Sequence, residues 1–357
     1  MFKHVPFSSA SAHQTHTDIP PRRPLALDRR GFLLGGIAAF GTLTLSACTS
    51  DGTSLTGVFA ASPQPDEKLV NFYWALKDAA EAASGKKAAG LNATAKVYED
   101  QAALLAKEIS RQCGRDDEGK APEQCTAATA PSARTSAAND SNTAPNDEEL
   151  RKSALTLITS PANSDKEDAL QSNRTVAGIA TGIYAALAVT SNSAALEEAQ
   201  RIDEKAVADG FGGAQGEALK ALADAIDMTY GAIYVSGLAL AADGGNNRET
   251  LRAVADRLRD FRESALAVLE AATADQPIPQ ASYQPPGGAP KDSASALETQ
   301  LKCTQPITEQ LRFLVTQTNR SESREFAARW CGLIARLEAA LERAQGNNPL
   351  DHATRGA

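Results

Sequence analysis

The chain has 357 residues, with 44 acidic and 36 basic side chains and a net charge of −8 at pH 7. Because residues 1–47 carry a balance of +3, the remainder carries −11. Such an acidic surface repels phosphate backbones and anionic head groups, which argues against a nucleic-acid partner and against polybasic attachment to a membrane. Ala, Leu, Glu and Arg are abundant while aromatic residues make up 5% of the chain, so the composition favours an all-α fold.

Residues 1–47 resemble an export signal peptide. Arg29 and Arg30 open the hexapeptide RRGFLL, which is similar to a twin-arginine motif, and a moderately apolar stretch follows. That stretch ends in LSAC at 45–48, which is similar to a bacterial lipobox, in which the cysteine is acylated and becomes the new N-terminus. We therefore expect Cys48 to carry lipid that holds the mature protein at the extracytoplasmic face of the cell membrane.

Two alternatives to this reading of the leader stay open. Asp28 stands where a twin-arginine motif usually has Ser or Thr, so the general secretory pathway could export the chain instead. The apolar stretch could also be an uncleaved membrane anchor, although it is short for a bilayer span of roughly 20 residues. Cys48 lies where a lipobox requires it, which favours cleavage and lipidation by either route.

The part of the chain that follows Cys48 begins with a flexible tether at 48–66, rich in small residues and proline. In 67–84 and again in 88–112, apolar residues recur every three or four positions, which predicts two helices with one apolar face each. Residues 114–145 are poor in apolar side chains and cannot bury enough surface to fold alone. We expect them to form a loop or a disordered insert.

Helix starts are predicted near 147 and 165, because a cap residue at Asn146 and at Ser164 is followed three positions later by Glu. The second of these helices continues to about Ser191 and is the most apolar in the chain. A further amphipathic stretch ends at a glycine-rich joint near Gly210. We place the boundary there, so that an N-terminal helical region occupies 67–210.

Residues 211–346 show a clearer pattern of long helices separated by two short turns and one proline-rich crossover. A capping box at Asn246 is expected to open the second of them. This order predicts an up-down four-helix bundle, followed by a disordered tail at 347–357. The four helices are expected at 214–242, from the box at 246–249 to 274, at 293–318 and at 322–345.

Four cysteines remain once Cys48 is assigned to lipid, and an even number in an oxidising compartment suggests two disulfides. Cys113 and Cys125 are the easiest pair, because the polar segment between them closes at little entropic cost. Cys303 and Cys331 then pair by elimination, although a symmetric hairpin turning near Arg320 would place them out of register. A zinc site is disfavoured, since neither CxxC nor CxH spacing occurs.

The histidines argue against familiar catalytic machinery. Three of the four lie in the segment that we expect to be removed, and His352 lies near the end of the chain. Histidine is the usual general base and the commonest ligand of transition metals. We therefore predict no catalytic residues, no metal site and no cofactor, while chemistry based on carboxylate, lysine or tyrosine stays possible.

The C-terminal half resembles an uncharacterised ferritin-like domain family of bacterial, actinobacterial-type envelope proteins. The resemblance covers roughly 214–345 and rests on YGAIYVSG at 230–237, RDFRE at 259–263 and PIPQASYQP at 277–285. It implies a ferritin-like bundle. Di-iron members of that fold use Glu and Glu-x-x-His ligands, whereas this sequence has Thr229 and Leu258 where ligands would be sought, so the metal chemistry does not carry over.

Several side chains of the bundle are candidates for a site. Carboxylates that could approach one another are more simply read as a solvated face; these are Asp224, Asp227, Glu263 and Glu298. The proline-rich loop is the best candidate for an interaction, because its prolines reduce the entropy lost on binding, although it could equally only cap the bundle. The predicted ligand crevice comprises Tyr230, Tyr234, Arg259, Arg262 and Tyr283.

These features predict a lipid-anchored protein of the cell envelope with a ferritin-like helical domain, which binds or scaffolds an envelope protein or a small ligand without catalysis. The alternative is a ferritin-like metal or redox enzyme that uses carboxylates alone. A solute-binding lipoprotein of a transporter is a third reading, but it expects alternating strands and helices.

Overall fold

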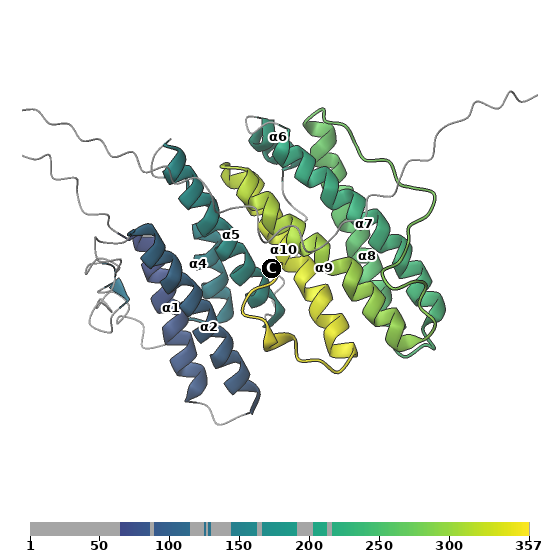
Figure 1. Cartoon of the computed structure of the whole chain (residues 1–357), viewed down its shortest axis with the longest axis horizontal. Coiled ribbons are helices and arrows are strands. Elements are labelled where there is room, and N and C mark those ends of the chain that lie inside the picture. Colours follow the sequence, from purple (N-terminus) through teal and green to yellow (C-terminus); the bar gives the residue numbers. More distant parts are fainter. Residues whose placement is uncertain are drawn as a thin grey trace, which may run out of the picture. The chain divides into compact units, whose positions relative to one another are not determined.

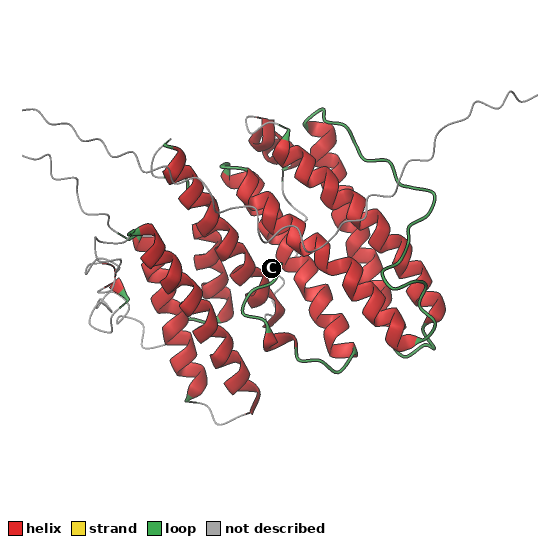
Figure 2. Ribbon diagram, viewed as in Figure 1, coloured by secondary structure: helices red, strands yellow, loops and turns green. Residues whose placement is uncertain are grey.

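A computed structural model describes residues 65–85, 89–114, 125, 128–129, 144–162, 166–190, 203–212 and 216–356. All regular secondary structure within these ranges is helical, which confirms the predicted all-α fold (Figure 2). The predictions for the export signal, for Cys48, and for nearly all of the tether and the insert fall outside the described residues.

Cap residues open two of the N-terminal helices, whereas the cap predicted at Ser164 lies outside the described residues. At the start of the first helix, Asp66 Oδ1 accepts hydrogen bonds from the backbone N–H groups of Lys68 and Leu69, at 2.9 and 3.2 Å. The capping box at Asn146 is confirmed, since Asn146 accepts from the N–H of Glu149 while the Glu149 carboxylate accepts from the N–H of Asn146. The helices are α1 (Glu67–Ser84), α2 (Ala89–Gln112), α4 (Asp147–Thr159), α5 (Glu167–Thr190) and α6 (Glu204–Gly212).

Four longer helices form the predicted bundle. The helix α7 packs against α8 and α9, while α10 packs against α9 and α8 (Figure 1). Their bounds are α7 (Glu217–Ala242), α8 (Arg248–Ala271), α9 (Ser293–Gln317) and α10 (Ser321–Ala344). Of the described helices, α7 alone is long and apolar enough to cross a membrane, and here it serves as a core helix of the bundle.

The start of α8 differs from the expected capping box. Asn247 is the N-cap and its side chain does not cap the helix. Instead, Asp243 Oδ2 accepts from the N–H groups of Gly245 and Asn247, at 3.0 and 3.2 Å. The box predicted at Asn246 is therefore wrong: the helix starts one residue later, and the Asp243 carboxylate sets the turn that precedes it.

One continuous core joins the helices on both sides of Gly210. From Val176 to Val189, α5 is buried along nearly its whole length, and it packs against α4, α9 and α10. The residues Ala60–Ala357 accordingly form one compact unit. At its centre Trp330 is fully buried against Phe261, with ring centroids 5.3 Å apart. Burial of large apolar side chains stabilises the fold by about 2 kcal/mol each.

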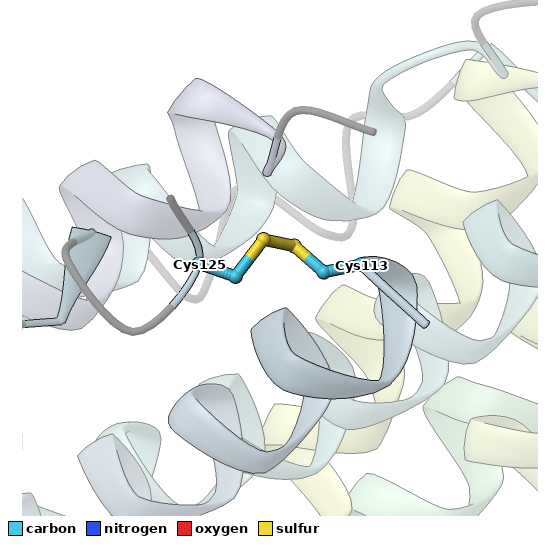
Figure 3. Close-up of a disulfide and its surroundings, with 2 residues drawn as sticks. All are labelled: Cys113 and Cys125. Atoms are coloured by element: carbon cyan, nitrogen blue, oxygen red, sulfur yellow. A yellow bond between two sulfur atoms is a disulfide. The ribbon is translucent and has the colours of Figure 1, made fainter. Parts of the chain in front are cut away.

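The predicted disulfide between Cys113 and Cys125 is confirmed (Figure 3). It joins the end of α2 to a residue of the insert, across a separation of 12 residues. Closing a loop of this size stabilises the folded state by about 3 kcal/mol in the chain-entropy model. Beyond it, Trp74 Nε1 donates to the carbonyl oxygen of Ala128 at 3.0 Å, so that α1 also holds this segment.

The second predicted disulfide is wrong, because Cys303 and Cys331 are free thiols. The turn between α9 and α10 places Cys331 beside Thr308, whose carbonyl oxygen lies 3.6 Å from the Cys331 sulfur. Cys303 is five residues earlier on α9, or about 7.5 Å along the helix axis. Burial raises the pKa of the Cys303 thiol to about 11, so this thiol stays protonated and unreactive at neutral pH.

The C-terminal segment 346–356 is ordered, contrary to the expected disordered tail. Residues Pro349–Asp351 form a 3₁₀ turn, η4, and the Arg355 side chain is only 4% exposed. The backbone N–H of Arg355 donates to Gly182 O at 3.0 Å, and Gln101 Nε2 donates to Ala353 O at 2.9 Å. A polar segment stays ordered here because buried groups on α2, α5 and α10 supply its hydrogen-bond partners.

Candidate functional site

Four of the five residues predicted to line a crevice lie in two neighbouring contacts. The loop 272–292 crosses α7 at Gly231, where an added Cβ would lie 3.3 Å from the Tyr283 ring. The rings of Tyr234 and Tyr283 have centroids 5.8 Å apart, and the Arg262 guanidinium lies 5.8 Å from the centroid of Tyr230. Gly231 therefore permits the close approach that seats the loop.

Arg259 does not join this group. It forms an exposed ion pair with Asp256 at 2.6 Å on α8. Arg262 also pairs with its neighbour Glu263, at 3.2 Å, so its charge is already balanced. The predicted crevice is therefore filled by packed contacts among the loop 272–292 and the helices α7 and α8. We call this contact region the seam; in it, aromatic rings support the loop.

The seam displays apolar side chains to solvent. Tyr234 is 39% exposed and Ile278, on the loop, is 84% exposed. The loop is braced internally, since the Tyr283 hydroxyl accepts from the backbone N–H of Gln280 at 2.9 Å. We call Tyr234, Ile278 and Tyr283 the loop surface.

The candidate carboxylates do not converge on a metal. Asp224 pairs with Lys220 at 2.8 Å and Glu298 with Lys302 at 2.5 Å, each within its own helix. Among the residues that the structure describes, no group of three His, Cys, Asp or Glu side chains could hold a metal ion. These pairs fit the solvated-face interpretation of the sequence.

The interior of the bundle holds neutral polar groups that bond to one another. Thr229 is fully buried and its hydroxyl donates to Ala225 O at 2.7 Å. The Ser236 hydroxyl lies 2.9 Å from Ala232 O and 3.0 Å from Oε1 of Gln300, which links α7 to α9. Satisfied buried groups of this kind specify how the helices pack.

A buried charge cluster, which sequence reasoning missed, lies where the C-terminal segment meets α10. Arg355 donates to Glu342 Oε2 at 2.6 Å and to Glu338 Oε2 at 3.1 Å, and it also donates to Pro349 O at 2.8 Å. The Thr308 hydroxyl donates to Glu338. Desolvation raises the pKa of Glu338 to about 7, although the hydrogen bond from Thr308 and the charge of Arg355 oppose the rise.

Next to this cluster is a pocket of about 310 Å³ between α5, α9 and the C-terminal segment. Arg312 crosses it, and desolvation lowers the pKa of its guanidinium. Gly182 leaves room for this side chain, because an added Cβ would lie 3.1 Å from Arg312 Cζ. The pocket is lined by Thr175, Gly178, Ile179, Glu309, Arg312, Phe313, Thr316 and Gly356.

One sequence signal could have pointed to this pocket. Gly178 and Gly182 are one turn apart on α5, a spacing that lets another element approach a helix closely. An added Cβ on Gly178 would lie 2.9 Å from Thr316 Cγ2. The spacing gives no indication of which element approaches, and for that reason Arg312 could not be assigned from it.

The fold and these sites define an all-helical bundle protein. Residues 221–350 match a family model described as a domain of unknown function (DUF4439). The match runs from the second turn of α7 into η4, and so covers nearly all of the bundle α7–α10 and the start of the C-terminal segment. No curated protein and no solved structure matches the chain.

Proposed function

We propose that the protein is a lipid-anchored component of the cell envelope whose ferritin-like bundle binds a protein partner without catalysing a reaction. The LSAC tetrapeptide at 45–48 and the basic pair Arg29 and Arg30 support the anchor and the export. The proline-rich loop and the apolar side chains beside it support binding.

The observation that carries the binding role is the exposure of Ile278 on a braced loop. Apolar side chains scattered singly on a surface need no explanation, but this one lies on a loop that three tyrosine contacts hold in place. A loop already ordered before binding loses little entropy when a partner fixes it. A protein partner with an apolar pocket for Ile278, in contact with Tyr234, fits this arrangement.

We predict that the mature protein begins at Cys48 with acyl chains on its thiol and amine. Mass spectrometry of the N-terminal peptide should show their added mass. Cys48→Ala should abolish the lipid and the cleavage at this residue together, so that an unlipidated precursor that still carries residues 1–47 accumulates. Retention of the leader, or an unmodified Cys48, in the wild-type protein would contradict the proposed anchor.

Site-specific photocrosslinking in intact cells tests the binding role. A photoreactive residue at 278 should yield one discrete crosslinked species, and the same residue at 313 on α9 should not. Tyr283→Ala, which frees the loop from Gly231, should reduce the yield at least about tenfold if one strong contact is lost. Equal crosslinking from both positions would show that Ile278 marks no specific interface.

The same preparation separates this function from the alternative of a carboxylate-only metal or redox enzyme. Elemental analysis of the purified mature protein should find less than stoichiometric iron or manganese. A stoichiometric amount of either metal would favour the enzyme over the binding protein.

A further inference from the structure

The pocket between α5, α9 and the C-terminal segment contains a cation whose charge no described side chain neutralises. Arg312 donates from Nε to Gly178 O at 2.8 Å and from Nη1 to Gly356 O at 3.0 Å, and both acceptors are neutral. No described acidic side chain lies within salt-bridge distance of it, and Nη2 has no described partner. Arg312 is thus positioned and still able to bind a carboxylate.

The pocket also carries groups that can only accept hydrogen bonds. Glu309 lies one turn before Arg312 on α9, is exposed, and pairs with no described cation. The Thr175 hydroxyl already donates to Gln171 O at 2.9 Å, which leaves its oxygen as an acceptor. A ligand that contacts both of these side chains has an anionic group for Arg312 and a cationic group for Glu309.

Apolar side chains lie beside these polar groups. Ile179 and Phe313 line the pocket, and Phe313 is 50% exposed. The volume of about 310 Å³ is at the small end of ligand sites, which run from roughly 300 to 1,000 Å³. A zwitterion also avoids the repulsion that the acidic protein exerts on net anions.

We propose that this pocket binds a free amino acid with an apolar side chain. The α-carboxylate binds Nη2 of Arg312, and the α-ammonium binds Glu309 and the Thr175 oxygen. The side chain packs against Ile179 and Phe313. This site is separate from the loop surface and does not depend on the proposed protein partner.

Calorimetric titration of the full chain in detergent tests the ligand class, with L-leucine as the probe. Saturable binding of leucine is expected. Leucinamide lacks the carboxylate and 4-methylpentanoate lacks the ammonium, so each should bind at least about tenfold more weakly. Absence of saturation at about 10 mM leucine, or equal binding of leucinamide, would overturn the proposal.

Two matched substitutions on α9 locate the site. Glu309→Gln, at an exposed position, should weaken leucine binding at least about tenfold while leaving 4-methylpentanoate binding unchanged. Glu298→Gln removes a carboxylate that is paired with Lys302 outside the pocket, and should leave leucine binding unchanged. Unchanged leucine affinity in the Glu309 variant, or equal losses in both variants, would show that leucine binds elsewhere.

Discussion

Replacing Arg324 by Met is expected to lower the free energy of unfolding by about 4 kcal/mol. The Arg324 side chain is fully buried at the start of α10. It donates to Thr318 O at 2.7 Å and Asn173 Oδ1 at 2.6 Å. It also donates, at 3.2 to 3.3 Å, to Ile158 O, Ser160 O and Asn319 Oδ1. Met fills similar volume but leaves these acceptors without a donor.

The size of this effect follows from what Arg324 joins. Its acceptors lie at the end of α4, on α5, and in the turn between α9 and α10, so one side chain ties the N-terminal helices to the bundle. Burial lowers the pKa of its guanidinium to about 10, with a smaller contribution from Arg174, so it is still charged at neutral pH. Each buried acceptor that loses its partner costs about 1–3 kcal/mol.

Urea unfolding followed by circular dichroism measures this loss. Arg324→Lys should also lower the free energy of unfolding, because a single ammonium cannot reach acceptors in three segments. The ammonium still donates to some of these acceptors, so the loss should be about half that of Arg324→Met. Arg259→Met removes an exposed arginine paired with Asp256 and should change stability by no more than about 0.5 kcal/mol. If Arg324→Met unfolds at the same urea concentration as Arg259→Met, Arg324 does not hold the helices together.

Helix positions could be predicted because their signals are local. The apolar period alone puts the first helix at 67–84, the bounds that α1 has. Asn146 likewise marks the start of α4. The prediction at α8 failed because the N-cap is Asn247, one residue later than expected, and Asp243 on the preceding helix binds the turn between the two helices.

The candidate site could be predicted only in part, because long-range contacts depend on the register between packed helices and on which surface each loop covers. The sequence analysis grouped Tyr283 with Tyr234, and their ring centroids lie 5.8 Å apart, but nothing in the sequence places the loop against Gly231. Nothing local distinguishes Arg355, in a short polar segment, from a solvated residue. Its partners Glu338 and Glu342 likewise read as an exposed charged face until the C-terminal segment covers them.

The second large effect is expected for Arg355→Gln, and it depends on pH. At pH 8 the substitution deprives the buried carboxyl groups of Glu338 and Glu342 of their cation, a change that costs about 3–5 kcal/mol. At pH 5 the loss should be smaller, because Glu338, whose pKa is about 7 in the folded protein, is then protonated. Loss of the arginine charge raises that pKa further.

In the wild-type protein, Glu338 determines whether the free energy of unfolding rises or falls with pH. The folded-state pKa of Glu338 is raised above the ordinary value of 4.5, so unfolding releases a proton between these two pH values. The free energy of unfolding therefore falls as the pH rises from about 4.5 to 7, by about 3 kcal/mol from this residue. Glu338→Gln should remove most of that slope in urea unfolding measured at several pH values.

A double substitution separates lost charge balance from lost packing. In the Arg355→Gln background, Glu338→Gln should recover part of the stability at pH 8, because it removes one of the two unpaired charges. His352→Gln is a needed control, since His352 Nε2 lies 3.4 Å from Glu342 Oε1. Arg343→Gln, on α10 outside the cluster, loses a hydrogen bond to Val189 O at 3.2 Å and should show a small loss that is the same at both pH values. A loss for Arg355→Gln that is equal at pH 5 and pH 8, with no recovery in the double variant, would mean that packing, and not charge, makes Arg355 necessary.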